Sequence, residues 1–182
     1  MDRDTLQKCV EQGESLEFVF FWGHTSSADG ALGPFCLSQW YPASFVDAGV
    51  TYFAAEHFMM AEKARLFGDE EVRAKIIATK DPSVAKKLGR AVRNFEESVW
   101  REHRYQIVCR ASLLKFGQNH ELRRYLLSTG SAILVEASPK DAIWGIGLGA
   151  KDPKARQPAA WPGLNLLGFA LMEAREMLRA ET

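Results

Sequence analysis

The chain has 182 residues, of which 47% are hydrophobic and 25% charged, and its formal net charge is zero. This length and composition predict one globular domain with a substantial core. No stretch approaches the roughly 18 uninterrupted apolar residues of a membrane span, and the first residues lack a signal-peptide pattern. We therefore expect a cytoplasmic protein with no membrane partner.

The cysteines and histidines show no metal-ligand spacing. Cys9, Cys36 and Cys109 form an odd, widely spaced set, which is typical of buried or half-buried thiols in a reducing compartment. The four histidines likewise lack a ligand pattern such as HExxH. We expect no metal and no other cofactor.

The positive charge is concentrated in the middle of the chain. Between Lys80 and Arg124, eleven Lys or Arg residues stand against five acids. Such a block can steer a phosphorylated ligand or a nucleic acid. More often it is the solvated side of amphipathic helices, and we favour that interpretation.

The patterning predicts an α+β fold that is mainly helical with a small β-sheet, in which residues 1–15 are an N-terminal extension and residues 16–182 form the domain. A β-rich run at Leu16–Trp22 predicts the first strand, followed by a loop from Gly23 to Gly33. Residues 44–53 predict two short strands that turn around Asp47–Gly49 and lead into a helix.

Capping signals divide the helical part of the chain. Gly68 ends one helix and Asp69 begins the next, while Asp81 and Pro82 mark the start of a short helix that Gly89 closes. The remaining expected elements are a long helix from about Phe95 to Phe116 ended by Gly117, a helix capped by Asn119 and reaching Gly130, a strand at 131–137 and a helix at 164–179.

The segment from Tyr52 to Ala64 carries an acid and an amine, Glu56 and Lys63, seven residues apart. At about 100° per residue, seven steps return within roughly 20° of the starting direction, so the two side chains share one helical face. Met59 and Met60 lie on the same side. This arrangement indicates a site, although the spacing alone more often marks a solvated face.

A glycine-rich connection precedes the last helix. Three glycines stand within five residues, at positions 145, 147 and 149, and allow the backbone to approach a ligand closely. Asn165, near the expected helix start, is placed to point its amide at a ring or a phosphate. The alternative is a long connection with Trp144 and Trp161 filling the core beneath it.

These motifs together resemble the NADAR superfamily, which includes N-glycosidases of riboflavin intermediates and hydrolases that remove ADP-ribose from guanine. The resemblance covers roughly residues 18–179. It rests on Phe21-Trp22, Leu37-Ser38-Gln39-Trp40, Ala55-Glu56-His57 with Lys63, Gly89-Arg90, Trp100, Lys115-Phe116, Asp141-x-x-Trp144-Gly-x-Gly-Leu, Asp152-Pro and Trp161-x-Gly-x-Asn165 with Gly168 and Met172.

The resemblance implies hydrolysis of a bond between ribose C1 and an exocyclic amine of a base, as in phosphoribosylamino-pyrimidine intermediates of riboflavin biosynthesis. Glu56 is then the acid/base, and Lys63 either attacks the opened C1 as a nucleophile or pairs with a phosphate or hydroxyl. Two alternatives are removal of ADP-ribose from guanine in a nucleic acid and non-catalytic binding of NAD or ADP-ribose. The expected partner is a small phosphoribosyl or ADP-ribosyl molecule, with nucleic acid as the alternative.

The resemblance also divides the remaining residues between binding and scaffold. Tryptophans 22, 40 and 144 are either stacking partners of the base or core residues, and Arg90 and Lys115 either bind phosphate or are surface residues. His57 points about 100° away from Glu56 on a helix, which indicates a structural role. Asp141 and Asp152 orient the glycine loop or contact the ligand. Riboflavin-type members carry an acid where this chain has Ile146. The expected ligand-binding residues are Trp22, Ser38, Gln39, Arg90, Trp144, Gly145, Gly147, Asp152 and Asn165.

Overall fold

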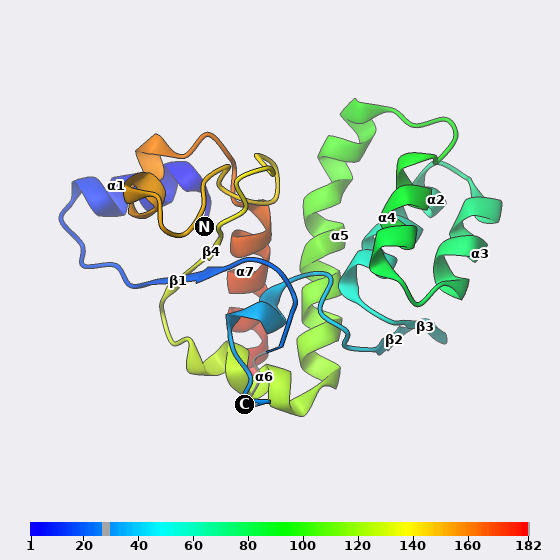
Figure 1. Ribbon diagram of the computed structural model, residues 1–182, viewed down its shortest axis with the longest axis horizontal. Coiled ribbons are helices and arrows are strands. Elements are labelled where there is room, and N and C mark those ends of the chain that lie inside the picture. The colour runs from blue at the N-terminus through cyan, green and yellow to red at the C-terminus, as the bar shows by residue number, and fades with distance from the viewer. Residues whose placement is uncertain (27–29, 182) are drawn as a thin grey trace. The chain divides into compact units, whose positions relative to one another are not determined.

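Contacts between helices and strands group the chain into two units in the computed structural model, which describes residues 1–26 and 30–181 (Figure 1). The first unit combines Met1–Ser38 with the segment that begins at Arg124, and the second is Gln39–Arg123. Helices dominate, and the strands are short and few. The predicted α+β class, mainly helical with small sheets, is confirmed.

The first unit is built on a two-stranded parallel sheet. Strand β1 (Phe18–Phe21) pairs with β4 (Ile133–Glu136), and Phe18 lies opposite Ile133. Helix α7 (Leu166–Ala180) packs against β4. Both strands and the helix were predicted from the sequence. The predicted loop from Gly23 to Gly33 lies partly outside the described residues.

The N-terminal segment contains a helix that the sequence analysis did not predict. Helix α1 (Arg3–Glu11) begins after Asp2, whose carboxylate accepts a hydrogen bond from the Thr5 amide at 2.8 Å. Leu6 is fully buried, and Arg3 Nη1 donates to the carbonyl of Trp161 at 3.3 Å. The segment expected to be an extension is thus docked on the first unit.

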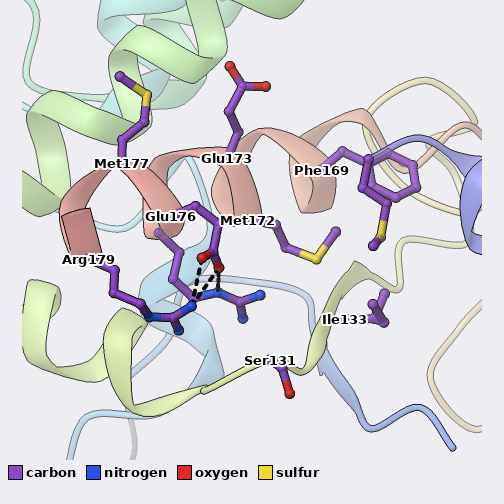
Figure 2. A pocket seen from close by; sticks show the side chains of 10 residues that line it. Ser131, Ile133, Phe169, Met172, Glu173, Glu176, Met177 and Arg179 are labelled. Carbon is purple, nitrogen blue, oxygen red and sulfur yellow. Dashed lines mark hydrogen bonds and ion pairs between the residues drawn. The ribbon is translucent and has the colours of Figure 1, made fainter.

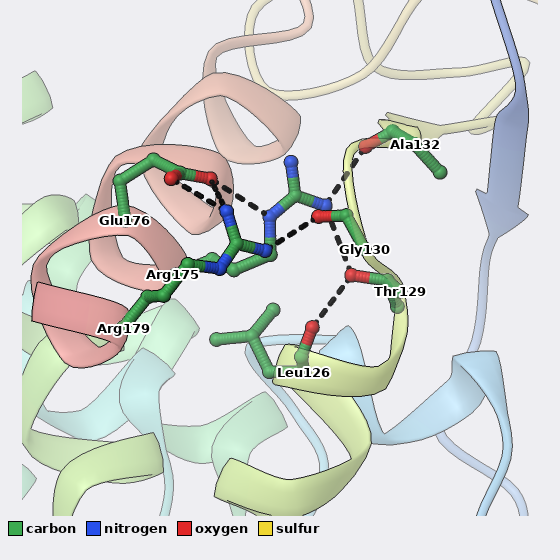
Figure 3. A network of polar contacts seen from close by, with 7 residues as sticks. All are labelled: Leu126, Thr129, Gly130, Ala132, Arg175, Glu176 and Arg179. Carbon is green, nitrogen blue, oxygen red and sulfur yellow. Dashed lines mark hydrogen bonds and ion pairs between the residues drawn. The ribbon is translucent and has the colours of Figure 1, made fainter. Parts of the chain in front are cut away.

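Two arginines of α7 hold the turn between α6 (His120–Ser128) and β4 (Figure 3). Arg175 Nη1 donates to Thr129 Oγ1 and to the Ala132 carbonyl, both at 2.9 Å. Arg179 Nη2 donates to the Gly130 carbonyl at 2.7 Å. Burial lowers the pKa of Arg175, and its bonds compensate the cost of burying a charge. These contacts fix the start of β4 against the last helix.

The second unit begins with a tight hairpin. Strands β2 (Phe45–Asp47) and β3 (Val50–Tyr52) pair antiparallel. The two turn residues, Ala48 and Gly49, both have left-handed φ angles, 48° and 80°. Two successive positive φ values are typical of a type I′ turn, whose twist matches that of the strands. The predicted pair of short strands is confirmed.

Four helices complete this unit: α2 (Ala55–Leu66), α3 (Glu70–Ala78), α4 (Pro82–Arg90) and α5 (Glu97–Gln118). Helices α3, α4 and α5 all pack against α2, which is therefore buried over most of its length. The predicted caps are confirmed, since Asp69 accepts from the Val72 amide and Asp81 from the Ser83 amide.

Two predicted helix ends are wrong. Gly89 lies inside α4, where an added Cβ would stand 2.1 Å from Met60 Sδ, so this glycine serves the close approach of α4 to α2. Helix α5 continues through Gly117 to Gln118. The Asn119 side chain donates to the Lys115 carbonyl at 2.8 Å and so closes α5. Asn119 also stands directly before α6, as predicted, where its carbonyl accepts from the Arg123 amide at 2.8 Å.

The cysteines behave as predicted: Cys36 and Cys109 are buried, Cys9 is half-buried, and all three are free thiols. Within the described part of the chain, no helix combines the length and apolar character that a membrane crossing needs.

Asp69 joins the start of α3 to the connection between α4 and α5. Its carboxylate accepts from the Arg93 backbone amide at 2.9 Å and from Arg93 Nε at 3.0 Å. These bonds from Arg93, reinforced by the Val72 amide, hold the pKa of Asp69 well below its usual range. The carboxylate therefore anchors residues 91–96, a segment without regular secondary structure.

We expect Asp69→Asn to lower the melting temperature by about 3 °C or more near pH 7. The pKa of Asp69 is lower in the folded than in the unfolded chain, so its contribution is present above about pH 4 and is lost as the pH falls through the folded pKa. Melting curves at pH 7 and pH 3 test this, because the difference from wild type should shrink at pH 3. Lys75→Gln, which removes an exposed ion pair with Glu71 and leaves Arg93 untouched, is the control and should change little. An equal loss at both pH values would contradict the assignment.

Candidate functional site

Glu56 lies in the first turn of α2 and is almost completely buried, with 3% of its surface exposed. Its backbone amide donates to the Gln39 carbonyl at 3.0 Å, which joins the segment before the hairpin to the start of the helix. Met59 and Met60, one turn further along, are also buried. The acid therefore sits in an apolar part of the second unit.

Lys63 lies two turns further along the same helix and is half-buried. Its Nζ stands 4.0 Å from the centre of the Phe95 ring and 5.6 Å from that of Trp100. Burial lowers the pKa of Lys63, the nearby charge of Glu97 opposes this shift, and Arg90 reinforces it.

Phe95 and Trp100 were given no role by the sequence analysis. Trp100 was noted only as part of the resemblance, and Phe95 only as the expected start of a long helix. Both residues border the N-terminus of α5, close in sequence to the basic Arg90. Aromatic residues close in sequence to a basic residue are only a weak sign of a cation–aromatic contact. The contact with Lys63 becomes visible only when the packing of α5 against α2 is known.

Arg90 is the exposed last residue of α4. Because Gly89 lets α4 approach Met60 closely, Arg90 is brought near enough to Lys63 to influence its pKa. Two cations at this end of α2 suit an anionic ligand group. This agrees with the expectation that Arg90 binds phosphate, which stays a prediction.

Gln39 offers an unsatisfied acceptor. Its side chain is 7% exposed, and its Oε1 atom is buried without a hydrogen-bond partner. A buried acceptor without a donor costs free energy, on the order of 1–3 kcal/mol. An N–H or O–H group of a ligand would satisfy it. Through its carbonyl bond to the Glu56 amide, Gln39 is also fixed beside the candidate acid.

His57 and Lys115 are both almost completely buried. His57 is fully buried, its ring nitrogens accept and donate no hydrogen bond, and burial lowers its pKa, which fits the expected structural role. Lys115 is 1% exposed, with Nζ 5.6 Å from the Tyr41 ring and 4.9 Å from the Phe116 ring. It belongs to the interior of the second unit.

The first unit holds the other expected ligand-binding residues. Trp22 follows β1 and is 63% exposed. Phe18 and Phe20 of β1 stack on each other at 5.9 Å, and the Arg156 guanidinium lies 5.4 Å from the Phe20 ring. Ser38 and Trp144 are half-buried, so all three candidates keep some accessible surface.

The glycine-rich connection is shaped by contacts with its own backbone. A Cβ at Gly145 would lie 2.7 Å from the Glu136 carbonyl oxygen. Gly147 has a left-handed φ of 72°, and its amide donates to the Asp141 carbonyl at 3.1 Å. Asp141 Oδ1 in turn accepts from the Trp144 amide at 2.8 Å. The glycines thus allow a tight fold of the loop, and at Gly149 nothing lies within 4 Å of an added Cβ.

Asp152 and Asn165 also bond to the backbone. Asp152 Oδ1 accepts from the Lys154 amide at 2.8 Å and begins a short 3₁₀ turn. Asn165 is fully buried, its Nδ2 donates to the Leu134 carbonyl and its Oδ1 accepts from the Glu136 amide, each at 3.0 Å. Asn165 therefore connects β4 to α7 through both atoms of its side-chain amide, and the ring or phosphate contact that the sequence suggested stays a prediction.

The first unit has a groove of about 510 Å³ (Figure 2). Helix α7 supplies most of its lining, with Phe169 and Met172 forming an apolar floor. Its charged groups already pair, since Arg179 Nη1 lies 2.7 Å from Glu176 Oε2. None of the expected site residues lines this groove, so its size does not make it the reaction site.

Within the described residues, no three His, Cys, Asp or Glu side chains gather as metal ligands. The expected site residues divide between the units: Gln39, Glu56, Lys63 and Arg90 belong to the second, and Trp22, Ser38, Trp144, Gly145, Gly147, Asp152 and Asn165 to the first.

Comparison with known proteins places this arrangement in a family. The profile of the NADAR domain matches residues 20–179. The chain belongs to the NADAR domain family. The match includes Glu56, Lys63 and every other expected site residue, and leaves out α1.

Relatives of this NADAR chain carry informative names. It is 42% identical to "N-glycosidase R617" of Acanthamoeba polyphaga mimivirus over 90% of this chain and 97% of that protein. It is 37% identical to "N-glycosidase YbiA" of Escherichia coli over 73% of this chain and 74% of that protein. The solved structure of E. coli YbiA matches 91% of this chain and 86% of its own, with a TM-score of 0.71 at 32% identity.

Proposed function

We propose that this NADAR protein is an N-glycosidase that hydrolyses the bond between ribose C1 and an exocyclic amine of a base. The names of R617 and YbiA support hydrolysis of an N-glycosyl compound. The observation that carries the proposal is the half-buried Lys63 amine, with its lowered pKa, on the same helix as the buried Glu56. Because the two residues are seven positions apart on α2, Lys63 and Glu56 share one face of the helix.

The proposed reaction proceeds through the opened sugar. The amine lone pair of the substrate forms a C1=N bond as the ring oxygen leaves and takes a proton from Glu56. The unprotonated Lys63 amine adds to C1 and returns a proton to Glu56, which passes it to the exocyclic nitrogen, so that the base departs and a Schiff base forms between Lys63 and C1. Water then adds to the Lys63 Schiff base with Glu56 as base, and the free sugar leaves. In the milder alternative, Lys63 only pairs with the ligand, and Glu56 with water carries the hydrolysis.

We favour a phosphoribosylamino-pyrimidine as substrate. A Vibrio vulnificus protein named as a riboflavin biosynthesis protein is 32% identical over 79% of this chain, although the match covers only 35% of that protein. Arg90 beside Lys63 suits a single phosphate, and the free Gln39 acceptor suits an N–H or hydroxyl donor. The three cysteines are free thiols, which fits a reducing compartment and supports a location in the cytoplasm.

Removal of ADP-ribose from guanine in a nucleic acid is the second candidate. The basic residues between Lys80 and Arg124 favour it only in part, because several of them are paired within the chain. Arg93 bonds to Asp69, Arg110 to Asp47 at 2.7 Å, and Arg104 lies 3.6 Å from Glu97. This internal pairing supports the helix-surface interpretation and a small-molecule substrate. A non-catalytic module that binds NAD or ADP-ribose is the third candidate.

Mass spectrometry of the products distinguishes these candidates. The protein is incubated with a phosphoribosylaminouracil and, separately, with an oligonucleotide carrying ADP-ribosylated guanine. We expect a free aminouracil from the first substrate and a modified oligonucleotide that stays unchanged. Restored guanine would establish the second candidate, and a bound ligand without product from either substrate would establish the binding module. Steep salt dependence of oligonucleotide binding would further favour the nucleic-acid substrate.

A further inference from the structure

The contact between Phe95 and Lys63 is unusual because the ring comes from a segment without regular secondary structure. Phe95 lies between α4 and α5, its side chain is partly exposed, and its ring centre is 4.0 Å from Lys63 Nζ. An irregular segment needs separate anchors if it is to hold a ring over an amine.

Three features of the structure hold this segment in place. Two residues before Phe95, Arg93 bonds to the buried Asp69 carboxylate through its backbone amide and its side chain. Asn94 adopts a left-handed φ of 56° and so turns the chain directly before Phe95. On the other side, Phe67 meets the Phe95 ring edge-to-face at 5.3 Å, a favourable aromatic geometry.

Phe67 and Lys63 lie next to each other at the end of α2. The Phe67 amide donates to the Lys63 carbonyl at 3.3 Å at the end of α2, so the two side chains leave the same helical face one turn apart. The Phe95 ring covers both of them. Trp100 is 8% exposed, and its ring centre lies 5.6 Å from Lys63 Nζ.

We infer that Phe95 is a positioning residue for Lys63, whose ring, anchored through Arg93 and Phe67, covers the amine and keeps water away from it until a substrate carbon arrives. The inference rests on the proposed nucleophilic role of Lys63. It adds a residue outside α2 that makes the amine reactive, and it gives the Arg93–Asp69 contact a role in the site.

Two physical effects of the ring oppose each other, and this makes the inference testable. The negative face of the ring attracts an ammonium group and favours the charged amine. Covering the amine removes water and favours the neutral form. With a second ring beside it and Arg90 nearby, Lys63 is placed where the loss of water prevails, in line with the direction of its pKa. Removing the ring should therefore return the amine toward ordinary lysine behaviour.

The test measures the reactivity of Lys63 without any substrate. The full-length protein is labelled with trace acetic anhydride over a range of pH, and the acetylation of the Lys63 peptide is quantified by mass spectrometry. In Phe95→Ala we expect the half-reactive pH to rise by about one unit, which lowers labelling near pH 8 about tenfold. Phe95→Leu keeps an apolar cover and should stay close to wild type. Phe18→Ala, which removes the ring from another cation–aromatic contact, is the control and should leave the Lys63 curve unchanged.

Turnover supplies the second readout. At neutral pH, Phe95→Ala should lower kcat about tenfold with little change in KM and should recover activity as the pH rises. Arg93→Gln, which loosens the anchor, should shift the labelling curve in the same direction but less. A labelling curve that is unchanged or moves to lower pH in a folded Phe95→Ala would overturn the inference. The labelling result is independent of catalysis, so an enzyme whose Lys63→Arg variant turns over normally would refute the proposed role of Lys63 while leaving the effect of Phe95 on the amine measurable.

Discussion

Lys63→Arg is expected to lower turnover about a thousandfold or more, because arginine keeps the positive charge but cannot form a Schiff base. The half-buried amine over Phe95 has a lowered pKa, so a larger fraction of it is unprotonated at neutral pH than for an exposed lysine. Arginine would retain any pairing with phosphate. The variant therefore separates the nucleophilic from the electrostatic role.

Borohydride provides the direct measurement. Added during turnover of the wild-type protein, it should reduce the Schiff base and leave the ribosyl group attached to the peptide that contains Lys63. Lys75→Arg, on the exposed side of α3, should be labelled and active as the wild type. If Lys63→Arg turns over normally and no adduct is trapped, Glu56 and water carry the reaction.

Glu56→Gln is expected to lower turnover about a hundredfold or more, with ligand binding retained. Glutamine has nearly the same volume and fits the buried position of Glu56, but it cannot transfer a proton. Single-turnover rates and ligand affinity, measured on the same preparation, check the two halves of this prediction.

Glu62→Gln is the matched control for Glu56. Glu62 belongs to the same helix and pairs with Arg65 at 2.9 Å, away from the face that Glu56 and Lys63 share. Its replacement should leave turnover within about twofold of wild type, because Glu62 does not share the helical face of the candidate acid and amine. Full activity in Glu56→Gln would exclude this carboxylate as the acid/base.

Local signals in the sequence predicted much of the second unit. The turn residues Asp47 to Gly49 require positive φ values at two positions, and Asp69 and Asp81 each precede a helix as N-caps. These features depend on neighbouring residues, which a sequence displays directly. The shared face of Glu56 and Lys63 follows in the same way from the helical period alone.

Contacts between distant segments could not be predicted. Gly89 looks like a helix end, and only the position of Met60 on α2 explains why a glycine is needed inside α4. The bonds of the Asn165 side chain to carbonyl and amide groups of β4 likewise depend on a strand about thirty residues earlier. The ring over Lys63 depends on how residues 91–96 are anchored, and no periodic pattern encodes that contact.

The pairing of β1 with β4 has a consequence for the order in which the chain folds during synthesis. Phe18 cannot pair until Ile133 has been synthesised. The helices around α2, in contrast, contact one another within Gln39–Arg123. That middle segment can fold while the ribosome is still adding the rest, because its contacts close shorter loops. The run from Phe18 to Phe21, rich in aromatic and β-branched residues, stays without its partner strand for that whole interval. Nascent chains stalled before residue 133 should therefore expose a segment prone to self-association and depend most on chaperones.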